Sequence, residues 1–432
     1  MNRVFKSKWS VAHQEYVVTD ENHRSRGKAA KSAVALAVTA LMLGAGAASA
    51  AYVDPGFVAK NSSQFAEAVT SWETPEYQKD WGLTALNAST AYALGYTGKG
   101  IAVGIMDSGA LMQIHPDLTG DRFHAVKVPG QSYGSSGDRY PQHTDGNLGH
   151  YEPGAAVPES GEWQKGVNDT HGTHVTGTVG GNRDGSEFHG VAWGADVYVG
   201  NTGGTDDTNY GPFEDPQYFY QGWSAIAKAV SDANRFSDGT TRGGFINNSF
   251  GTNMRVKDNG SKGPDGGNTG VHFKTNTASE TEYEYFLFQQ DAKNRVNTDS
   301  HWNGRSFVDA AYEAVKDEKV VQVFTTGNRD FANPFYRPLY PYFNPEAEQN
   351  WVAVAAMKQA DDGSYTLYST LNEAGEAKWW TVAAPGRAIY SSITDDDGNP
   401  SYALFSGTSM AAPHVTGALT VLMQRYDQMD AL

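Results

Sequence analysis

Short apolar runs alternate with stretches of helical spacing along most of the chain. The runs at residues 101–106, 320–324 and 351–356 have the length of strands and little polar interruption, as is typical of strands buried on both faces of a parallel sheet. Apolar residues recur every three or four positions at 223–230 and 307–315, which predicts amphipathic helices between the strands. This alternation predicts an α/β fold, a mostly parallel sheet with helices on both faces.

Two long polar segments interrupt the pattern, at about residues 119–166 and 252–304. Both are rich in Gly, Asn, Asp and Ser and lack the apolar periodicity of an independent core, so we predict surface insertions rather than domains. Residues 51–76 are weakly patterned and are predicted to be a linker or a short N-terminal arm. The remainder, residues 77–432, is predicted to be one domain with its ligand site at the carboxyl ends of the strands.

The first 50 residues predict a cleaved signal peptide. Basic residues precede an apolar run at residues 33–43, and small residues then lead to Ala48-Ser49-Ala50, which is a cleavage pattern of exported proteins. The run is too short for a spanning helix, and a membrane anchor is the alternative interpretation. The chain has 0 cysteines, which agrees with export into an oxidising compartment, although chance depletion explains it nearly as well.

The overall charge narrows the range of partners. With 49 acidic and 33 basic residues, the formal net charge is -16 at pH 7. Surfaces that bind phosphates are basic, so this balance argues against a nucleic-acid partner. Charge alone does not indicate the fold.

Side chains that lie far apart in the chain are candidates for nucleophilic catalysis. Asp107 directly follows the apolar run at 101–106, where a carboxylate can be held partly desolvated, although Asp-Ser-Gly alone is a turn signal. His171 is expected to open a helix, and its spacing from His174 does not match a zinc protease motif. The third candidate is Ser409, in the segment SGTSMAAPHVTG.

Ser409 is expected to lie at the start of a helix. Pro413 follows it by four positions, and the first four N–H groups of a helix have no internal partner, so a proline there loses no hydrogen bond. The helix is therefore predicted to begin at about Ser409, where the helix dipole is positive. Ala411 stands where the serine elbow of esterases and lipases has its second glycine, which disfavours those enzymes.

A hydroxyl, an imidazole that takes its proton and a carboxylate that orients the imidazole form a catalytic triad. Asp107, His171 and Ser409 occur in the chain order of the subtilisin triad. Their segments, GKGIAVGIMDSG, HGTHVTGTVGG and GTSMAAPHVTGA, resemble the three signature blocks of the subtilisin-like serine proteases, and the similarity extends over roughly residues 81–422. The resemblance implies a three-layer αβα fold and a serine endopeptidase that acts through an acyl-enzyme.

The same resemblance implies residues that bind the substrate. Asn328 follows an apolar run, and in the family such an Asn donates its side-chain N–H to the oxyanion, beside the backbone N–H of Ser409. A segment that pairs with extended peptide as an added strand is implied at residues 249–251, where Phe250 replaces the commoner aliphatic residue. The implied substrate-binding residues are Ser249, Phe250, Gly251, Thr326 and Gly327.

No metal or other cofactor is expected, with calcium left open. Asp117 matches a family position that can help bind calcium, but its companion ligands cannot be placed in the sequence. The acidic stretch at residues 395–399 lies between strand-like runs and lacks the downstream Glu of a calcium loop. A hairpin turn is therefore predicted there.

The leader resembles a known class of signal. Residues 1–9 (MNRVFKSKW), 16–18 (YVV) and 25–28 (SRGK) are similar to the extended signal peptide of large Gram-negative autotransporters and related exoproteins. A wrongly assigned start codon is the alternative. The resemblance implies export to the cell surface or the extracellular space, protein or peptide substrates, and an outer-membrane translocation barrel that is not in this chain.

Two expectations concern the protein as a whole. The family usually has another helix after the helix of the nucleophile, so the domain is expected to be C-terminally incomplete at Leu432. The alternative to an enzyme is a catalytically inactive surface binding module or adhesin on the same fold. Peptide-cleavage activity would separate these two functions.

Overall fold

The structure is a computed structural model that describes the strands at 5–10 and 15–20 and residues 54–127, 160–165, 168–202, 216–250, 289, 292–293, 299–328, 330–395 and 397–432. It divides into two compact units, Met1–Ala51 and Tyr52–Leu432. The first unit contains an antiparallel hairpin of β1 (Phe5–Ser10) and β2 (Glu15–Asp20), and the rest of the predicted signal peptide lies outside the described residues. Among the described helices, none is long and apolar enough to cross a membrane.

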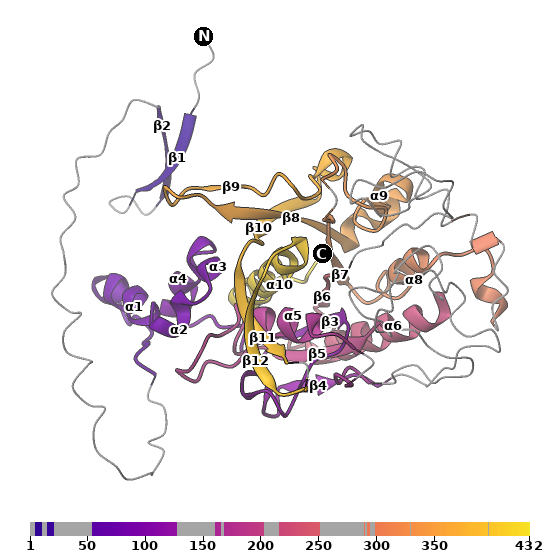
Figure 1. The fold of residues 1–432 in the computed structure, drawn as a ribbon, viewed down its shortest axis with the longest axis horizontal. Coiled ribbons are helices and arrows are strands. Elements are labelled where there is room, and N and C mark those ends of the chain that lie inside the picture. The colour runs from indigo at the N-terminus through magenta and orange to yellow at the C-terminus, as the bar shows by residue number, and fades with distance from the viewer. Residues whose placement is uncertain are drawn as a thin grey trace. The chain divides into compact units, whose positions relative to one another are not determined.

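A parallel sheet runs through the second unit (Figure 1). Its strand order is β10-β8-β7-β6-β3-β5-β4, all pairs along this path are parallel, and β9 pairs antiparallel with β8. The predicted α/β fold with a mostly parallel sheet is confirmed. The strands are β3 (Ala102–Asp107), β4 (Phe123–Ala125), β5 (Asp196–Asn201), β6 (Gly244–Asn248), β7 (Val320–Thr325), β8 (Trp351–Gln359), β9 (Tyr365–Leu367) and β10 (Thr381–Pro385).

The helices from α1 to α4 have eight residues or fewer, whereas α5, α6 and α10, which cover the sheet, have 10, 18 and 18. In chain order they are α1 (Phe65–Trp72), α2 (Pro75–Gln78), α3 (Trp81–Ala85), α4 (Ala88–Ala93), α5 (His171–Gly180), α6 (Pro216–Ala233), α8 (Phe307–Glu313), α9 (Tyr340–Phe343) and α10 (Thr408–Arg425). The 3₁₀ helices are η1 (Ser62–Gln64), η2 (Pro116–Leu118), η3 (Ser300–Trp302), η4 (Pro345–Asn350) and η5 (Gly375–Ala377). The segment predicted to be a linker or arm therefore carries α1.

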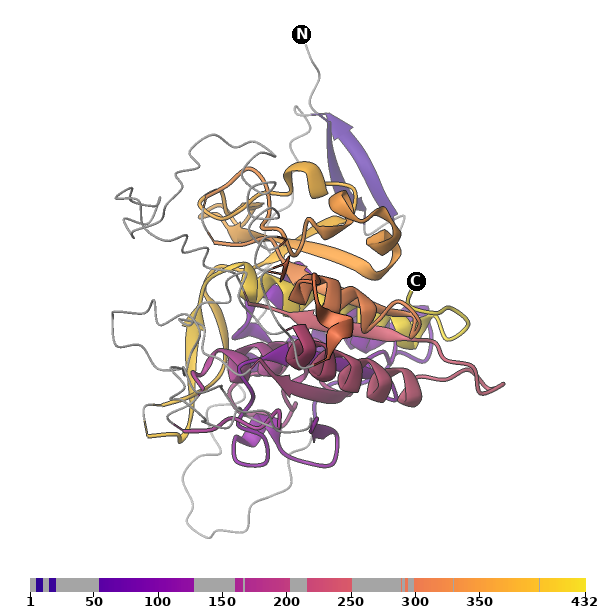
Figure 2. The same cartoon turned by 90° about the vertical axis from the view of Figure 1, so that its right-hand side faces the viewer.

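Both faces of the sheet are buried under helices (Figures 1 and 2). Along β3, Val103 and Ile105 belong to a core shared with α5 and α10, whereas Ala102 and Met106 belong to a second core shared with α6 and α8. Successive side chains of a strand point to opposite faces, so a strand covered on both sides requires a continuous apolar run. The helices on the two faces form the outer layers of the three-layer fold.

The predicted insertions lie largely outside the described residues, although β4 and η3 fall within them. The predicted turn at residues 395–399 is confirmed, because β11 (Ile389–Thr394) and β12 (Pro400–Phe405) form an antiparallel hairpin. The hairpin is closed by the N–H of Asp395, which donates to the carbonyl oxygen of Asn399 at 2.9 Å. This hairpin packs against α5, which is the helix of one candidate catalytic residue.

Candidate active site

The candidate carboxylate and imidazole form a buried hydrogen bond. Asp107 is the last residue of β3 and is 1% exposed, and His171 is the first residue of α5 and is 6% exposed. The Oδ1 atom of Asp107 lies 2.8 Å from Nδ1 of His171. Because a carboxylate can only accept, the imidazole carries its proton on Nδ1 in this bond, which leaves Nε2 as its basic nitrogen.

The start of α5 is tied to the loop that follows β3. Asp169 Oδ1 accepts the backbone N–H of His171 at 2.9 Å and the hydroxyl of Ser108 at 2.7 Å. Ser108 Oγ in turn accepts the N–H of Gly172 at 2.9 Å. These bonds satisfy N–H groups of the first turn, which have no partner inside a helix. A Cβ at Gly172 would lie 2.2 Å from the carbonyl oxygen of Gly109, so glycine permits this close approach of helix and loop.

Ser409 lies in the first turn of α10, which packs beside α5 (Figure 1). It is 7% exposed. Its hydroxyl donates to the carbonyl oxygen of Ser249 at 2.5 Å, and the hydroxyl of Ser249 donates to the carbonyl oxygen of Ser409 at 2.8 Å. A hydroxyl has one proton to donate, so in this conformation the proton of Ser409 is directed to Ser249. The structure joins Asp107 to His171 and Ser409 to Ser249, and a bond between Ser409 and His171 stays a prediction.

The predicted start of the nucleophile helix is correct to about one residue, but the predicted role of Pro413 is wrong. The helix begins at Thr408, so Pro413 stands inside it, beyond the first turn. A residue at this position would normally donate its N–H to the carbonyl oxygen of Ser409, and proline has no N–H. The proline therefore does remove a helical hydrogen bond, and the hydroxyl of Ser249 supplies a replacement.

Asn328 lies next to the start of the same helix. Its Oδ1 accepts the N–H of Thr408 at 2.9 Å and the hydroxyl of Thr408 at 3.0 Å. These two bonds show which end of the Asn328 amide is the oxygen, so Nδ2 is the end that can donate. A Cβ added to Gly407 would lie 3.2 Å from Nδ2. Gly327 has a φ of 119°, which favours glycine at the turn after β7. The placement of Asn328 beside Ser409 agrees with an oxyanion role, which stays a prediction.

Of the predicted substrate-binding residues, Ser249 and Phe250 follow β6, and Thr326 and Gly327 follow β7. Ser249 and Thr326 are fully buried, Phe250 is 2% exposed, and Gly251 lies outside the described residues. The ring of Phe250 belongs to the core under α6, and its centre lies 5.0 Å from the guanidinium carbon of Arg337. The sequence reasoning missed this buried arginine, because its local sequence does not distinguish it from a surface residue.

Two further histidines of α5 and α10 are buried and structural. His174 Nε2 lies 3.0 Å from the carbonyl oxygen of Ile389, and burial lowers its pKa to about 3, so the ring is neutral. His414 Nε2 lies 2.8 Å from Asp80 Oδ2. Burial opposes the charge of His414, but the charge and the hydrogen bond of Asp80 outweigh burial and raise its pKa. Within the described ranges, no group of three or more His, Cys, Asp or Glu side chains could hold a metal ion.

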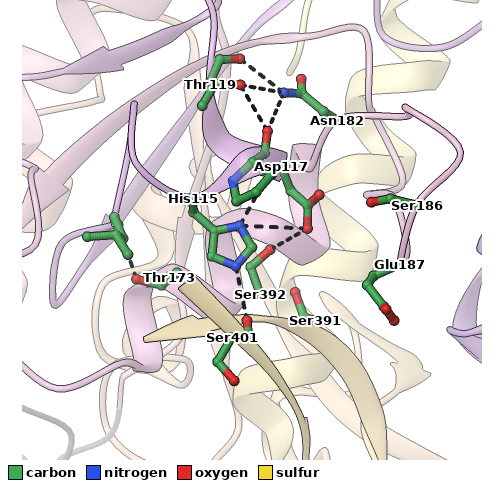
Figure 3. A network of polar contacts seen from close by, with 12 residues as sticks. His115, Asp117, Thr119, Thr173, Asn182, Ser186, Glu187, Ser391, Ser392 and Ser401 are labelled. Atoms are coloured by element: carbon green, nitrogen blue, oxygen red, sulfur yellow. Dashed lines mark hydrogen bonds and ion pairs between the residues drawn. The ribbon is translucent and has the colours of Figure 1, made fainter. Parts of the chain in front are cut away.

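Figure 3 shows the polar network around Asp117, the residue at the possible calcium position. The hydroxyl of Ser392 donates to Asp117 Oδ2 at 3.0 Å. His115 Nδ1 lies 3.8 Å from the same Oδ2. Burial raises the pKa of Asp117 to about 7. Calcium takes about six to eight oxygen ligands, mainly from carboxylates, carbonyls and water. In the described residues no group of three or more His, Cys, Asp or Glu side chains surrounds Asp117, so the structure adds no companion ligands to this position.

We expect the Asp117→Asn variant to match the unmodified chain in stability near pH 4 and to exceed it at pH 8. The pKa of Asp117 rises from 3.8 to about 7 on folding, so the stability from its protonated form is present below pH 3.8 and is lost as the pH rises to about 7. Asparagine stays neutral and can still accept the hydroxyl of Ser392. One pKa unit corresponds to about 1.4 kcal/mol, so the gain in unfolding free energy at pH 8 is at most about 4 kcal/mol.

Urea unfolding at pH 4 and pH 8 measures this difference. Asp361→Asn, at an exposed position, is the matched control and should leave the pH dependence unchanged. If Asp117→Asn has the same pH dependence as this control, burial does not hold Asp117 protonated.

Two protein-family models match this chain. The family model described as "Subtilase family" matches residues 98–431, and the model described as "Extended Signal Peptide of Type V secretion system" matches residues 1–50. An "Extracellular serine protease" of Serratia marcescens is 30% identical over 407 residues, which cover 88% of this chain and 32% of the relative. The "Neisserial autotransporter lipoprotein NalP" of Neisseria meningitidis serogroup B is 24% identical over 367 residues, which cover 80% of this chain and 30% of the relative.

The chain thus spans about a third of the length of these relatives. Among solved structures, the nisin leader peptidase NisP from Lactococcus lactis superposes with a TM-score of 0.47 at 19% sequence identity. That superposition covers 83% of this chain and 87% of the other.

Proposed function

The chain belongs to the subtilase family, and on this premise we propose that it is a serine endopeptidase whose catalytic triad is Asp107, His171 and Ser409. The extended signal peptide at residues 1–50 directs export to the cell surface or the extracellular space. The observation that supports the triad most is the buried 2.8 Å bond between Asp107 and His171, with Ser409 in the first turn of the helix that packs beside α5.

In the proposed reaction, the hydroxyl of Ser409 turns from Ser249 to Nε2 of His171 and gives up its proton as its oxygen attacks a peptide carbonyl. Asp107 orients the imidazole and stabilises the imidazolium that forms. Asn328 Nδ2 and the backbone N–H of Ser409 donate to the oxyanion. The imidazolium then protonates the leaving amine, and water releases the acyl group from the serine. The residues that carry these steps require no metal or other cofactor.

The relatives support a wider proposal about context. One of them is named an autotransporter, and the leader of this chain matches a type V secretion signal. We propose that a translocation domain, separate from residues 1–432, takes the protease across the outer membrane. Its substrates are then proteins or peptides outside the cell.

Active-site labelling tests the proposed function directly. The secreted full-length gene product is treated with a fluorophosphonate, digested and mapped by mass spectrometry. The expected result is one adduct on the peptide that contains Ser409, because the reagent reacts with a serine that a neighbouring base activates. An inactive adhesin on this fold would give no adduct, and labelling only at another serine would contradict the assignment of the nucleophile.

We expect Asn328→Leu to lower kcat by about 10²–10³, the loss known for the corresponding donor of a subtilisin. The reason is that the amide Nδ2 is proposed to bond the oxygen only when it becomes negative, so KM should change little. Steady-state kinetics on a peptide substrate measure both constants.

Asn328→Asp is the sharper control for this prediction. It keeps an oxygen that can accept from Thr408, as Asn328 Oδ1 does, and replaces the donor Nδ2 with a second carboxylate oxygen, which cannot donate and whose charge opposes an oxyanion. Normal melting with a loss as large as that of Asn328→Leu supports the oxyanion role. Unchanged kcat in Asn328→Asp would show that the residue only shapes the start of α10.

A further inference from the structure

The carbonyl group of the proposed nucleophile lacks its usual partner in α10. In an α-helix a carbonyl oxygen accepts the N–H of the residue four positions later. For Ser409 that residue is Pro413, which has no N–H. A carbonyl left unpaired in the protein interior is costly, and Ser409 is only 7% exposed. A donor from outside the helix is therefore needed.

Ser249, at the end of β6, supplies that donor. Its hydroxyl donates to the carbonyl oxygen of Ser409 at 2.8 Å. The same hydroxyl oxygen accepts the Nδ2–H of Asn247 at 2.8 Å. Because Asn247 is the donor in that bond, the proton of the Ser249 hydroxyl remains available for Ser409. Asn247 lies in β6 and Ser249 directly follows the strand, two residues later.

The chain of hydrogen bonds returns to α10. Thr416 Oγ1 lies 3.0 Å from Oδ1 of Asn247 and 3.0 Å from the carbonyl oxygen of Ala412, so these two acceptors share its one proton. Thr416 lies two turns after Ser409 on the same helix. The side chains of Asn247, Ser249 and Thr416 are all 0% exposed. Buried hydrogen bonds thus join α10 to Asn247 of β6 and to Ser249, the residue that follows β6.

We propose that Ser249 is a positioning residue for the nucleophile Ser409, an inference that rests on the proposed function. Its hydroxyl takes the place of the helical N–H that Pro413 lacks and fixes the peptide plane between Ser409 and Met410. This plane sets the direction of the Ser409 side chain at the point where α10 begins. Asn247 and Thr416 hold the hydroxyl in the donating orientation.

The test compares Ser249→Ala with Ser249→Thr in the secreted full-length protein. The readouts are the rate constant for labelling by a fluorophosphonate, and kcat and KM on a peptide. Ser249→Ala is expected to slow labelling and kcat by about tenfold, the effect of one unsatisfied buried carbonyl on the position of the nucleophile. KM is expected to change little. Ser249→Thr keeps the hydroxyl and is expected to recover most of the rate.

Pro413→Ala makes the test specific to the carbonyl of Ser409. Alanine at 413 restores a helical N–H, so Pro413→Ala alone is expected to label at nearly the normal rate. The double variant combines Ser249→Ala with Pro413→Ala. In it, the new N–H of the alanine at 413 bonds the carbonyl oxygen of Ser409 in place of the missing hydroxyl, and labelling is expected to return to the rate of Pro413→Ala. A double variant about tenfold slower than Pro413→Ala overturns the proposal, and this comparison holds even if Ser249→Ala alone does not fold.

Ser231→Ala is the matched control, because Ser231 also has a buried hydroxyl but lies on α6, where its hydroxyl contacts that of Thr241 at 2.8 Å. It is expected to label at the normal rate. If the unmodified protein is not labelled, the proposed function fails. If the unmodified protein is labelled and Ser249→Ala matches it, the protease assignment stands and the positioning role of Ser249 is wrong.

Discussion

The Ser409→Ala variant is expected to lose about six orders of magnitude in kcat, the size of loss known for the triad serine of a subtilisin. The change removes the only atom that would bond covalently to the substrate. The backbone should tolerate it, because alanine is a good helix former and Ser409 sits in the first turn of α10. The variant also loses the 2.5 Å bond to the carbonyl oxygen of Ser249, which should lower stability only modestly.

Peptide hydrolysis and thermal melting together test this prediction. Ser406→Ala is the matched control, since Ser406 lies three residues earlier and its hydroxyl accepts the N–H of Ala388 at 2.8 Å. It should keep normal kcat. His171→Ala should be nearly as inactive as Ser409→Ala. The variant that carries both changes should have a kcat no lower than either single variant, because the members of a triad act as a unit. Activity that survives in Ser409→Ala would remove this residue from the mechanism.

The sequence predicted the parts of the fold that depend on local patterns. The apolar run at 101–106 became β3, with both faces buried, and the runs at 320–324 and 351–356 became β7 and β8. These runs carry their own signal, because a strand buried on both faces must be apolar throughout. The turn at 395–399 could be predicted from its own neighbourhood as well, since turn residues stand between two strand-like runs.

The contacts that build the site were harder to predict, because they join distant segments. Asp169 stands two residues before the start of α5 and has the chemistry of a helix cap, so it could have been found. Ser108 has no such signal, although its hydroxyl links Asp169 to Gly172. The role predicted for Pro413 is wrong for the same reason. Its missing hydrogen bond is replaced from β6 by Ser249, and no local rule contains that partner.

Asp107→Asn is expected to lower kcat by about 10⁴, the loss known for this change in another serine protease triad. The carboxylate accepts from Nδ1 of His171 at 2.8 Å and thereby keeps Nε2 unprotonated and basic. An asparagine can present its Nδ2–H to Nδ1 instead. The imidazole would then carry its proton on Nε2, facing the serine, and could not take the proton of Ser409.

Asp169→Asn separates this effect from a general loss of negative charge near the imidazole. Asp169 bonds the backbone N–H of His171 rather than its ring, and asparagine keeps an oxygen that can accept there, so kcat should fall by less than about tenfold. Both variants should bind substrate with nearly normal KM, because neither side chain is proposed to touch the peptide. A fall in kcat for Asp107→Asn no larger than that for Asp169→Asn would mean that the carboxylate of Asp107 does not set the protonation of His171. The 2.8 Å bond would then be structural, and the imidazole would need another partner to act as the base.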